Sequence, residues 1–131
     1  MVLAVRPGTS EAQRHESLAA WHRAQIRAAV APLLAKWQRI LKVEARAIFV
    51  RQMKTKWGSC NPKKATIRFN TDLAKKPLAC LEYVLVHELA HIIEPTHSDR
   101  FRAILSRHLP HWPHLRDRLN RAPLAHVDWE Y

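Results

Sequence analysis

The chain of 131 residues is 47% hydrophobic and 25% charged, with a formal net charge of +11, which is typical of one basic globular domain with a single core. It has no apolar run near the roughly 20 residues that a membrane span requires, and its N-terminus lacks the regions of a secretory signal. Cys60 and Cys80 have no CxxC spacing and suggest no disulfide framework, so we expect a cytoplasmic protein with buried thiols and no membrane partner.

The first third of the chain predicts an arm followed by a long helix. Residues 1–15 contain proline, glycine, threonine and serine with little periodicity, so we expect a flexible N-terminal arm. Residues 17–41 carry apolar side chains near helical spacing with basic side chains between them, which predicts an amphipathic helix. Pro32 lies inside this run and should kink or split the helix.

Two strands and a turn are predicted next. Residues 47–53 are rich in β-forming side chains and predict a strand, which residues 54–60 either continue or turn. Residues 61–64 read Asn-Pro-Lys-Lys and predict a turn, after which residues 65–70 predict a second strand. This part of the chain therefore predicts a small sheet.

A helix with a defined start and end follows the sheet. Pro77 suits the first turn of this helix, and Pro95 stops it, because the residue before a proline is disfavoured in helical geometry. Thr96 and Asp99 have the spacing of a capping box with Thr96 as N-cap. This cap would place His97 in the first turn of the next helix.

The C-terminal third predicts two more helices and a tail. Apolar side chains at helical spacing over residues 101–108 predict a helix that breaks near Pro110, and residues 112–120 predict a short final helix. Residues 122–131 are expected to form an extended tail. We therefore expect an α+β fold in which residues 16–121 form one compact domain.

The run HELAH at residues 87–91 is the most informative motif of the chain. On a helix, His87 and His91 project from one face and can bind one metal ion. Glu88 lies beside the first ligand, where it can act on a metal-bound water without being a ligand itself. A catalytic zinc site needs three protein ligands and one open position, so a third ligand is expected nearby.

Two residues are candidates for the third ligand. His97 follows the turn at Pro95 and offers a neutral nitrogen donor. Glu94 follows His87 at i+7 and projects from a similar face, but it lies at a helix end whose direction Pro95 changes. We favour His97, so the predicted cofactor is one zinc ion held by His87, His91 and His97.

These residues predict a hydrolytic mechanism. Zinc lowers the pKa of its bound water to about 7 and polarises a substrate carbonyl. Glu88 removes the water proton, the hydroxide attacks the carbonyl, and the same carboxyl group returns the proton to the leaving amine. Tyr83, His108 and His111 are candidates for a further donor to the tetrahedral intermediate, although a core or surface position is the better interpretation for each.

The motifs together resemble those of the YgjP-like metallopeptidases, which are zincins related to the SprT-like and minigluzincin-type proteases. The resemblance covers about residues 21–120 and rests on WGSC at 57–60, HELAH at 87–91 and HSxRF at 97–101. It implies a compact fold with a small sheet packed on the active-site helix and a flanking N-terminal helix. It also implies that the strand near residues 57–59 borders the cleft and can pair with an extended peptide.

The resemblance implies zinc bound by His87, His91 and His97, with Glu88 as general base. We therefore predict a zinc metallopeptidase that acts on a peptide or protein. The alternatives are a metal-dependent nucleoside triphosphate pyrophosphatase and a nucleic-acid-associated binding module with a structural metal. Glu88 argues against the binding module, because a structural site needs no base beside its ligand.

The positive charge is concentrated in one stretch of the chain. Eight basic residues and one acidic residue lie between Arg51 and Lys76. This stretch could bind a nucleic acid or another acidic partner, although a solvated basic surface is the simpler interpretation. No RNP, helix-turn-helix or zinc-finger spacing accompanies it.

Overall fold

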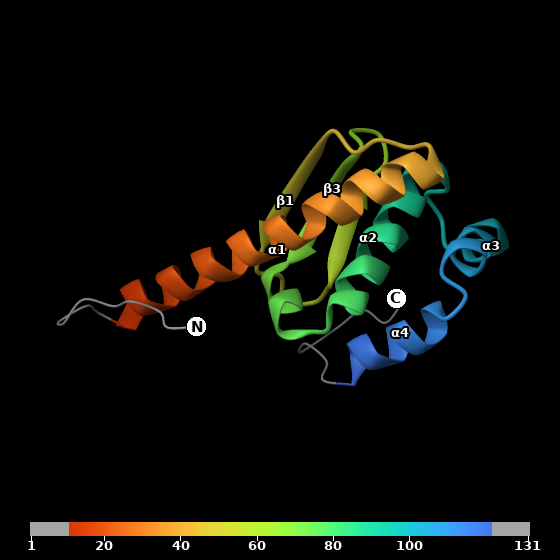
Figure 1. Ribbon diagram of the computed structural model, residues 1–131. Helices are drawn as coiled ribbons and strands as arrows, with labels where there is room; N and C mark the ends of the chain where they lie inside the picture. Colours follow the sequence, from red (N-terminus) through yellow and green to blue (C-terminus); the bar gives the residue numbers. More distant parts are fainter. Residues whose placement is uncertain (1–10, 122–131) are drawn as a thin grey trace.

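The computed structural model describes residues 11–121, in which one long helix and a small sheet precede three shorter helices (Figure 1). In chain order the elements are α1 (Glu11–Leu41), β1 (Ala47–Arg51), β2 (Gly58–Asn61), β3 (Thr66–Asn70), the 3-10 helix η1 (Thr71–Lys75), α2 (Leu78–Ile93), α3 (Asp99–His108) and α4 (Trp112–Asn120). The predicted α+β fold is confirmed. None of the helices described here has both the length and the apolar character to cross a membrane.

The sheet has the order β1-β3-β2, with β3 at its centre. β1 pairs with β3 in parallel, and β2 pairs with β3 in antiparallel register with Gly58 opposite Phe69. The alternation of a pleated strand turns Val50, Ile67 and Phe69 into the core. Within the described residues β2 is an edge strand, and this edge borders the site described below.

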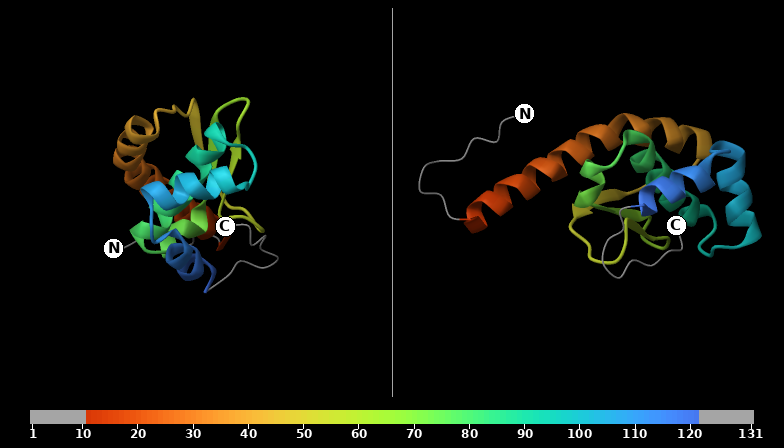
Figure 2. Two further views of the ribbon diagram at one scale, coloured as in Figure 1. Left: turned by 90° about the vertical axis from the view of Figure 1, so that its right-hand side faces the viewer. Right: turned by 90° about the horizontal axis from the view of Figure 1, so that it is seen from below.

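The helix α2 runs through the middle of the fold. The sheet and α1 pack on it, and α3 and α4 cover it from the other side (Figures 1 and 2). Every side chain from Tyr83 to His91 is consequently buried, although this segment includes two histidines and a glutamate. Polar groups in such a position need partners or a bound ion, because transfer from water to a protein interior is costly.

The helix α1 is longer and more continuous than the sequence predicts. It begins at Glu11 rather than at residue 17, and it continues through Pro32 without a break. Pro32 and Ala28, whose carbonyl loses its helical partner, both lie on the exposed face, where water can bond to that carbonyl. Residues 1–10 and 122–131, which hold most of the predicted arm and the predicted tail, lie outside the described residues.

The strands and their connections refine the sequence prediction. The first strand ends at Arg51 rather than at residue 53, and the end of the segment 54–60, for which the sequence permits a continuation or a turn, belongs to the separate strand β2. The sequence predicts no element for residues 71–75, which form η1 with Asn70 as N-cap. The Asn70 side-chain oxygen accepts a hydrogen bond from the Asp72 amide at 3.0 Å.

The predicted cap of α3 is wrong by two residues. Ser98, rather than Thr96, is the N-cap, and its hydroxyl accepts a hydrogen bond from the Phe101 amide at 3.3 Å. The Thr96 hydroxyl instead donates to the Glu94 carboxylate at 3.2 Å. His97 therefore lies in the loop before α3 and not in its first turn.

Candidate active site

Three imidazole rings converge on one point at the C-terminal end of α2. His87 and His91 lie one turn apart on α2, and His97 comes from the loop between α2 and α3. The three Nε2–Nε2 distances are 3.3 Å between His87 and His91, 3.0 Å between His91 and His97, and 3.3 Å between His87 and His97. No other group of three or more potential metal ligands gathers in this way within residues 11–121.

The spacing of these nitrogens fits a zinc ion. Nitrogen ligands at about 2.0–2.1 Å from a tetrahedral zinc lie about 3.3 Å from one another, which is close to the three observed distances. Three imidazole lone pairs that converge at this spacing would repel one another unless a cation or protons lay between them. Three nitrogen donors also leave one position of a tetrahedral zinc for water or substrate.

Contacts on the far side of two rings orient them. The His91 Nδ1 atom lies 3.2 Å from the backbone carbonyl oxygen of Glu94, and the His87 Nδ1 atom lies 3.5 Å from the Tyr83 hydroxyl. A proton on Nδ1 can be donated to these oxygens, which leaves Nε2 deprotonated and directed at the common point. Burial is the main cause that raises the pKa of Tyr83, so its hydroxyl stays protonated at neutral pH.

Phe101 of α3 packs against all three imidazoles. Its ring stacks on His91, with centroids 4.4 Å apart and planes at 17°, and meets His87 and His97 edge-on at 5.0 and 5.1 Å. The side chain is buried. The first hydrophobic residue of α3 therefore holds the three rings in their relative positions, which ties the site to the packing of this helix on α2.

The electrostatics of the site favour neutral imidazole. Burial, with smaller contributions from the neighbouring His91 and His97, lowers the pKa of His87 to about 2. His87 is therefore neutral over the physiological pH range. Only the neutral ring has a lone pair to give to a metal, so this environment prepares His87 to be a ligand.

Glu88 lies between α2 and the edge of the sheet. Its side chain is 2% exposed, and a β-carbon built on Gly58 would lie 3.1 Å from its Oε2 atom. The same β-carbon would lie 2.8 Å from Cγ1 of Val84. The absence of a side chain at Gly58 thus allows β2 to lie directly against the Glu88 carboxylate.

A cavity of about 280 Å³ opens beside these groups, between β2 and α2. Its two walls come from the segment that contains β2 and from the end of α2 with the following loop. The lining residues are Lys56, Gly58, Ser59, Cys60 and Pro62 on the first wall, and His87, Glu88, His91, Pro95 and His97 on the second. Burial, with a smaller contribution from Glu88, raises the pKa of Cys60 to about 12, so this thiol is a poor metal ligand at neutral pH.

The structure separates the predicted site residues into two groups. His87, Glu88, His91 and His97 line one cavity, whereas Tyr83, His108 and His111 do not line it. Tyr83 lies behind His87, and His108 packs edge-on against Trp37 of α1 at 6.1 Å. His111 is exposed at the start of α4.

Glu94, the rival third ligand, has other partners. Its carboxylate accepts a hydrogen bond from Thr96 and lies 4.0 Å from an Arg100 guanidinium nitrogen. It is not among the clustered ligand atoms. Glu94 contacts the site with its backbone carbonyl oxygen, which lies next to His91 Nδ1, rather than with its side chain.

Sequence reasoning missed the roles of three residues around the cavity. The sequence indicates Phe101 as a hydrophobic helix position within the HSxRF motif and Lys56 as part of a basic stretch, and it assigns neither a role in the site. Asn70 was expected only as the end of a strand. One signal could have drawn attention to them: Phe101 lies four residues after His97 in HSxRF, and Lys56 directly precedes the WGSC motif at 57–60.

Comparisons with known proteins agree with this geometry. The sequence family described as "YgjP-like, metallopeptidase domain" matches residues 1–122, and no curated protein matches the chain. The crystal structure of the metallopeptidase zymogen abylysin of Pyrococcus abyssi is similar, with a TM-score of 0.63 and 26% identity, and the match covers 68% of this chain and 90% of that one. The metallopeptidase zymogen jannalysin of Methanocaldococcus jannaschii is also similar, with a TM-score of 0.51, 26% identity and coverage of 64% and 81%.

Proposed function

The chain belongs to the YgjP-like metallopeptidase family and is a zinc metallopeptidase, and we propose which of its residues carry out peptide hydrolysis. His87, His91 and His97 bind the zinc ion through Nε2, and Glu88 is the general base. The convergence of three Nε2 atoms at 3.0–3.3 Å beside a buried glutamate carries this proposal.

Bound zinc supplies an acidified water and polarises the substrate carbonyl. The Glu88 carboxylate takes a proton from the attacking water and returns it to the leaving amine. Its burial between α2 and Gly58 fixes its position and excludes bulk water from it. The packing of Phe101 and the Nδ1 contacts of His87 and His91 keep the imidazoles oriented, so little reorganisation accompanies the reaction.

The substrate is an extended peptide that lies along the edge of β2. Backbone groups of an edge strand can pair with an incoming strand, and this edge forms one wall of the cavity that contains Glu88. Hydrolysis takes place in the cytoplasm, where thiols such as those of Cys60 and Cys80 stay reduced. A nucleic-acid or acidic partner at the basic stretch stays a prediction, and salt-sensitive DNA binding by the wild type would support it.

The test of the general base compares Glu88→Gln with the exposed Glu44→Gln as a matched control. We expect Glu88→Gln to keep one zinc per chain and to lose at least about a hundredfold in kcat/KM on a peptide library, while Glu44→Gln stays at the wild-type rate. Cleavage retained by Glu88→Gln would remove Glu88 from the mechanism. Release of pyrophosphate from nucleoside triphosphates without any peptide cleavage would favour the pyrophosphatase alternative.

The ligand assignment has its own test in metal analysis. His97→Ala should lose most of the zinc, because one of three protein ligands is removed, whereas Glu94→Ala should keep it. The reverse pattern would make Glu94 the third ligand.

A further inference from the structure

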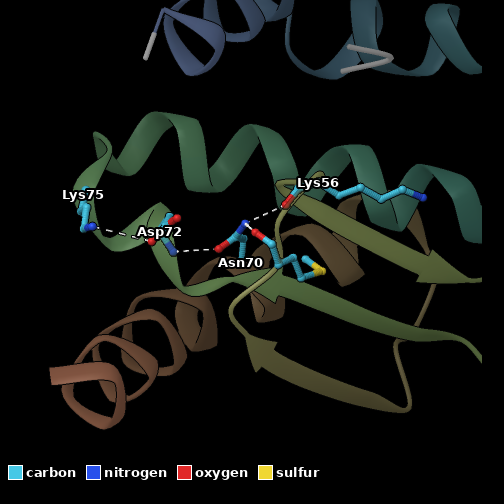
Figure 3. A network of polar contacts seen from close by, with 5 residues as sticks. Lys56, Asn70, Asp72 and Lys75 are labelled. Atoms are coloured by element: carbon cyan, nitrogen blue, oxygen red, sulfur yellow. Dashed lines mark hydrogen bonds and ion pairs between the residues drawn. The ribbon is translucent and has the colours of Figure 1, made fainter. Parts of the chain in front are cut away.

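The cavity beside Glu88 carries one exposed positive charge. Among its lining residues, Lys56 is the one lysine or arginine, and its side chain is exposed whereas Glu88 is buried. Within residues 11–121, Lys56 has no carboxylate partner within ion-pair distance. The nearby Asp72 pairs with Lys75 at 3.7 Å instead (Figure 3). A cation that no carboxylate of the described residues neutralises is suited to an acidic group of the substrate.

The backbone of Lys56 is held in place by a buried amide. Asn70 is fully buried, and its Nδ2 atom donates hydrogen bonds to the carbonyl oxygens of Met53 at 2.7 Å and Lys56 at 2.8 Å (Figure 3). The Asn70 backbone N–H also donates a hydrogen bond to the Trp57 carbonyl oxygen at 3.0 Å. The side chain that begins at this fixed point extends along β2, away from Asn70, in Figure 3. The backbone from which this side chain starts is therefore fixed by the fold.

The position of Lys56 relative to Glu88 limits where on a substrate it would act. Gly58 lies against the Glu88 carboxylate, and Lys56 precedes Gly58 by two residues, with a bend at Trp57 between them. Two residues of chain span at most about 7 Å, so a substrate residue beside Lys56 lies within about two positions of the bond opposite Glu88. This distance brings the ammonium group close to the side chain of that substrate residue.

We propose that Lys56 is a specificity-determining residue, and that this peptidase prefers substrates with an aspartate or glutamate about two residues from the scissile bond. The inference rests on the proposed function and names its substrate class. The preference acts through binding, because the ion pair is present in both the bound substrate and the transition state, so it changes KM more than kcat. It weakens with ionic strength, because the ammonium group is exposed.

The test uses three peptides that differ at one position, two residues from the cleaved bond, with Glu, Gln or Lys. The zinc-loaded wild type should cleave the Glu peptide roughly three- to tenfold more efficiently than the Gln peptide, with the Lys peptide slowest. In Lys56→Gln the preference should disappear, and in Lys56→Glu it should reverse. Lys54→Glu is the matched control, because Lys54 is exposed on the same turn, carries the same charge and does not line the cavity.

The outcomes separate this inference from the proposed function. Lys54→Glu should keep the wild-type ranking of the three peptides, and one zinc per chain in Lys56→Glu shows that this variant folds. An unchanged ranking of the three peptides in Lys56→Glu would overturn the role of Lys56 and leave the proposed function intact. Failure of the zinc-loaded wild type to cleave any of the three peptides would overturn the proposed function and this inference with it.

Discussion

A methyl group at Gly58 should damage both the stability and the activity of this protein. In Gly58→Ala the new β-carbon would lie 2.8 Å from Cγ1 of Val84, 3.1 Å from the Arg68 carbonyl oxygen and 3.1 Å from Oε2 of Glu88. The Arg68 carbonyl belongs to the central strand and cannot move without disturbing the β2–β3 ladder. The strand β2 must therefore shift away from α2, and overpacking of this kind costs about 1–3 kcal/mol of unfolding free energy.

The same shift should lower activity without removing the metal. A displacement of about 1 Å at an active site can cost about a hundredfold in rate, so kcat/KM should fall by about that factor. Zinc content should stay at one per chain, because the proposed ligands come from α2 and the following loop and not from β2. Urea unfolding, peptide cleavage and metal analysis of the purified variant measure the three quantities.

A double-mutant cycle with Val84→Ala tests the physical reason. Val84→Ala alone should cost roughly 2–3 kcal/mol, because it opens a cavity beside a fully buried helix position. It also removes the atom closest to the new methyl group, so the double variant should be more stable than the sum of the single effects by about 1 kcal/mol. Strict additivity, or wild-type stability and kcat/KM in Gly58→Ala, would refute the close-approach argument.

Three further predictions follow from the surroundings of the site. Tyr83→Phe removes the hydroxyl next to His87 Nδ1 and should weaken zinc binding about tenfold, as measured against a chromophoric chelator. Activity should return at saturating zinc, and an unchanged zinc affinity would argue against this orienting contact. Burial lowers the pKa of His87 from 6.5 to about 2, so between these pH values the unfolded chain binds one more proton than the folded chain. The contribution of neutral His87 to the free energy of unfolding of the metal-free protein should therefore be complete above pH 6.5 and fall by about 1.4 kcal/mol per pH unit below it. Urea unfolding with a chelator should show this slope reduced by about one proton in His87→Gln, and equal slopes in both proteins would contradict the assignment. Asn70→Ala should lower the free energy of unfolding by about 2–3 kcal/mol in urea, because it leaves the Met53 and Lys56 carbonyls without their donor. A loss below about 0.5 kcal/mol would argue against a structural role for these two hydrogen bonds.

The sequence predicts the helices well because their signals are local. The stop of α2 before Pro95 and the short α4 depend on neighbours within a few residues, and the structure agrees at these points. The HExxH spacing likewise brings His87 and His91 together on one helix face. Local patterns were sufficient where the relevant contacts are local.

The remaining differences come from side-chain contacts and solvent exposure that the sequence pattern does not specify. Both Thr96 and Ser98 can cap a helix, and the hydrogen bond of Thr96 to Glu94 decides between them. Continuity of α1 through Pro32 depends on which face meets solvent, and the sequence does not specify this. The role of Asn70 requires a turn that lies more than a dozen residues earlier in the chain, so no local pattern could indicate it.

The cavity is built from one continuous stretch of chain, because all of its lining residues lie between Lys56 and His97. The helices α1 and α4 lie outside this stretch and contribute buried surface to the core without lining the cavity. Substitutions in these two helices should therefore change how many molecules are folded, while each folded molecule keeps its turnover rate. Stability can therefore change through these two helices while the chemistry of the site stays the same.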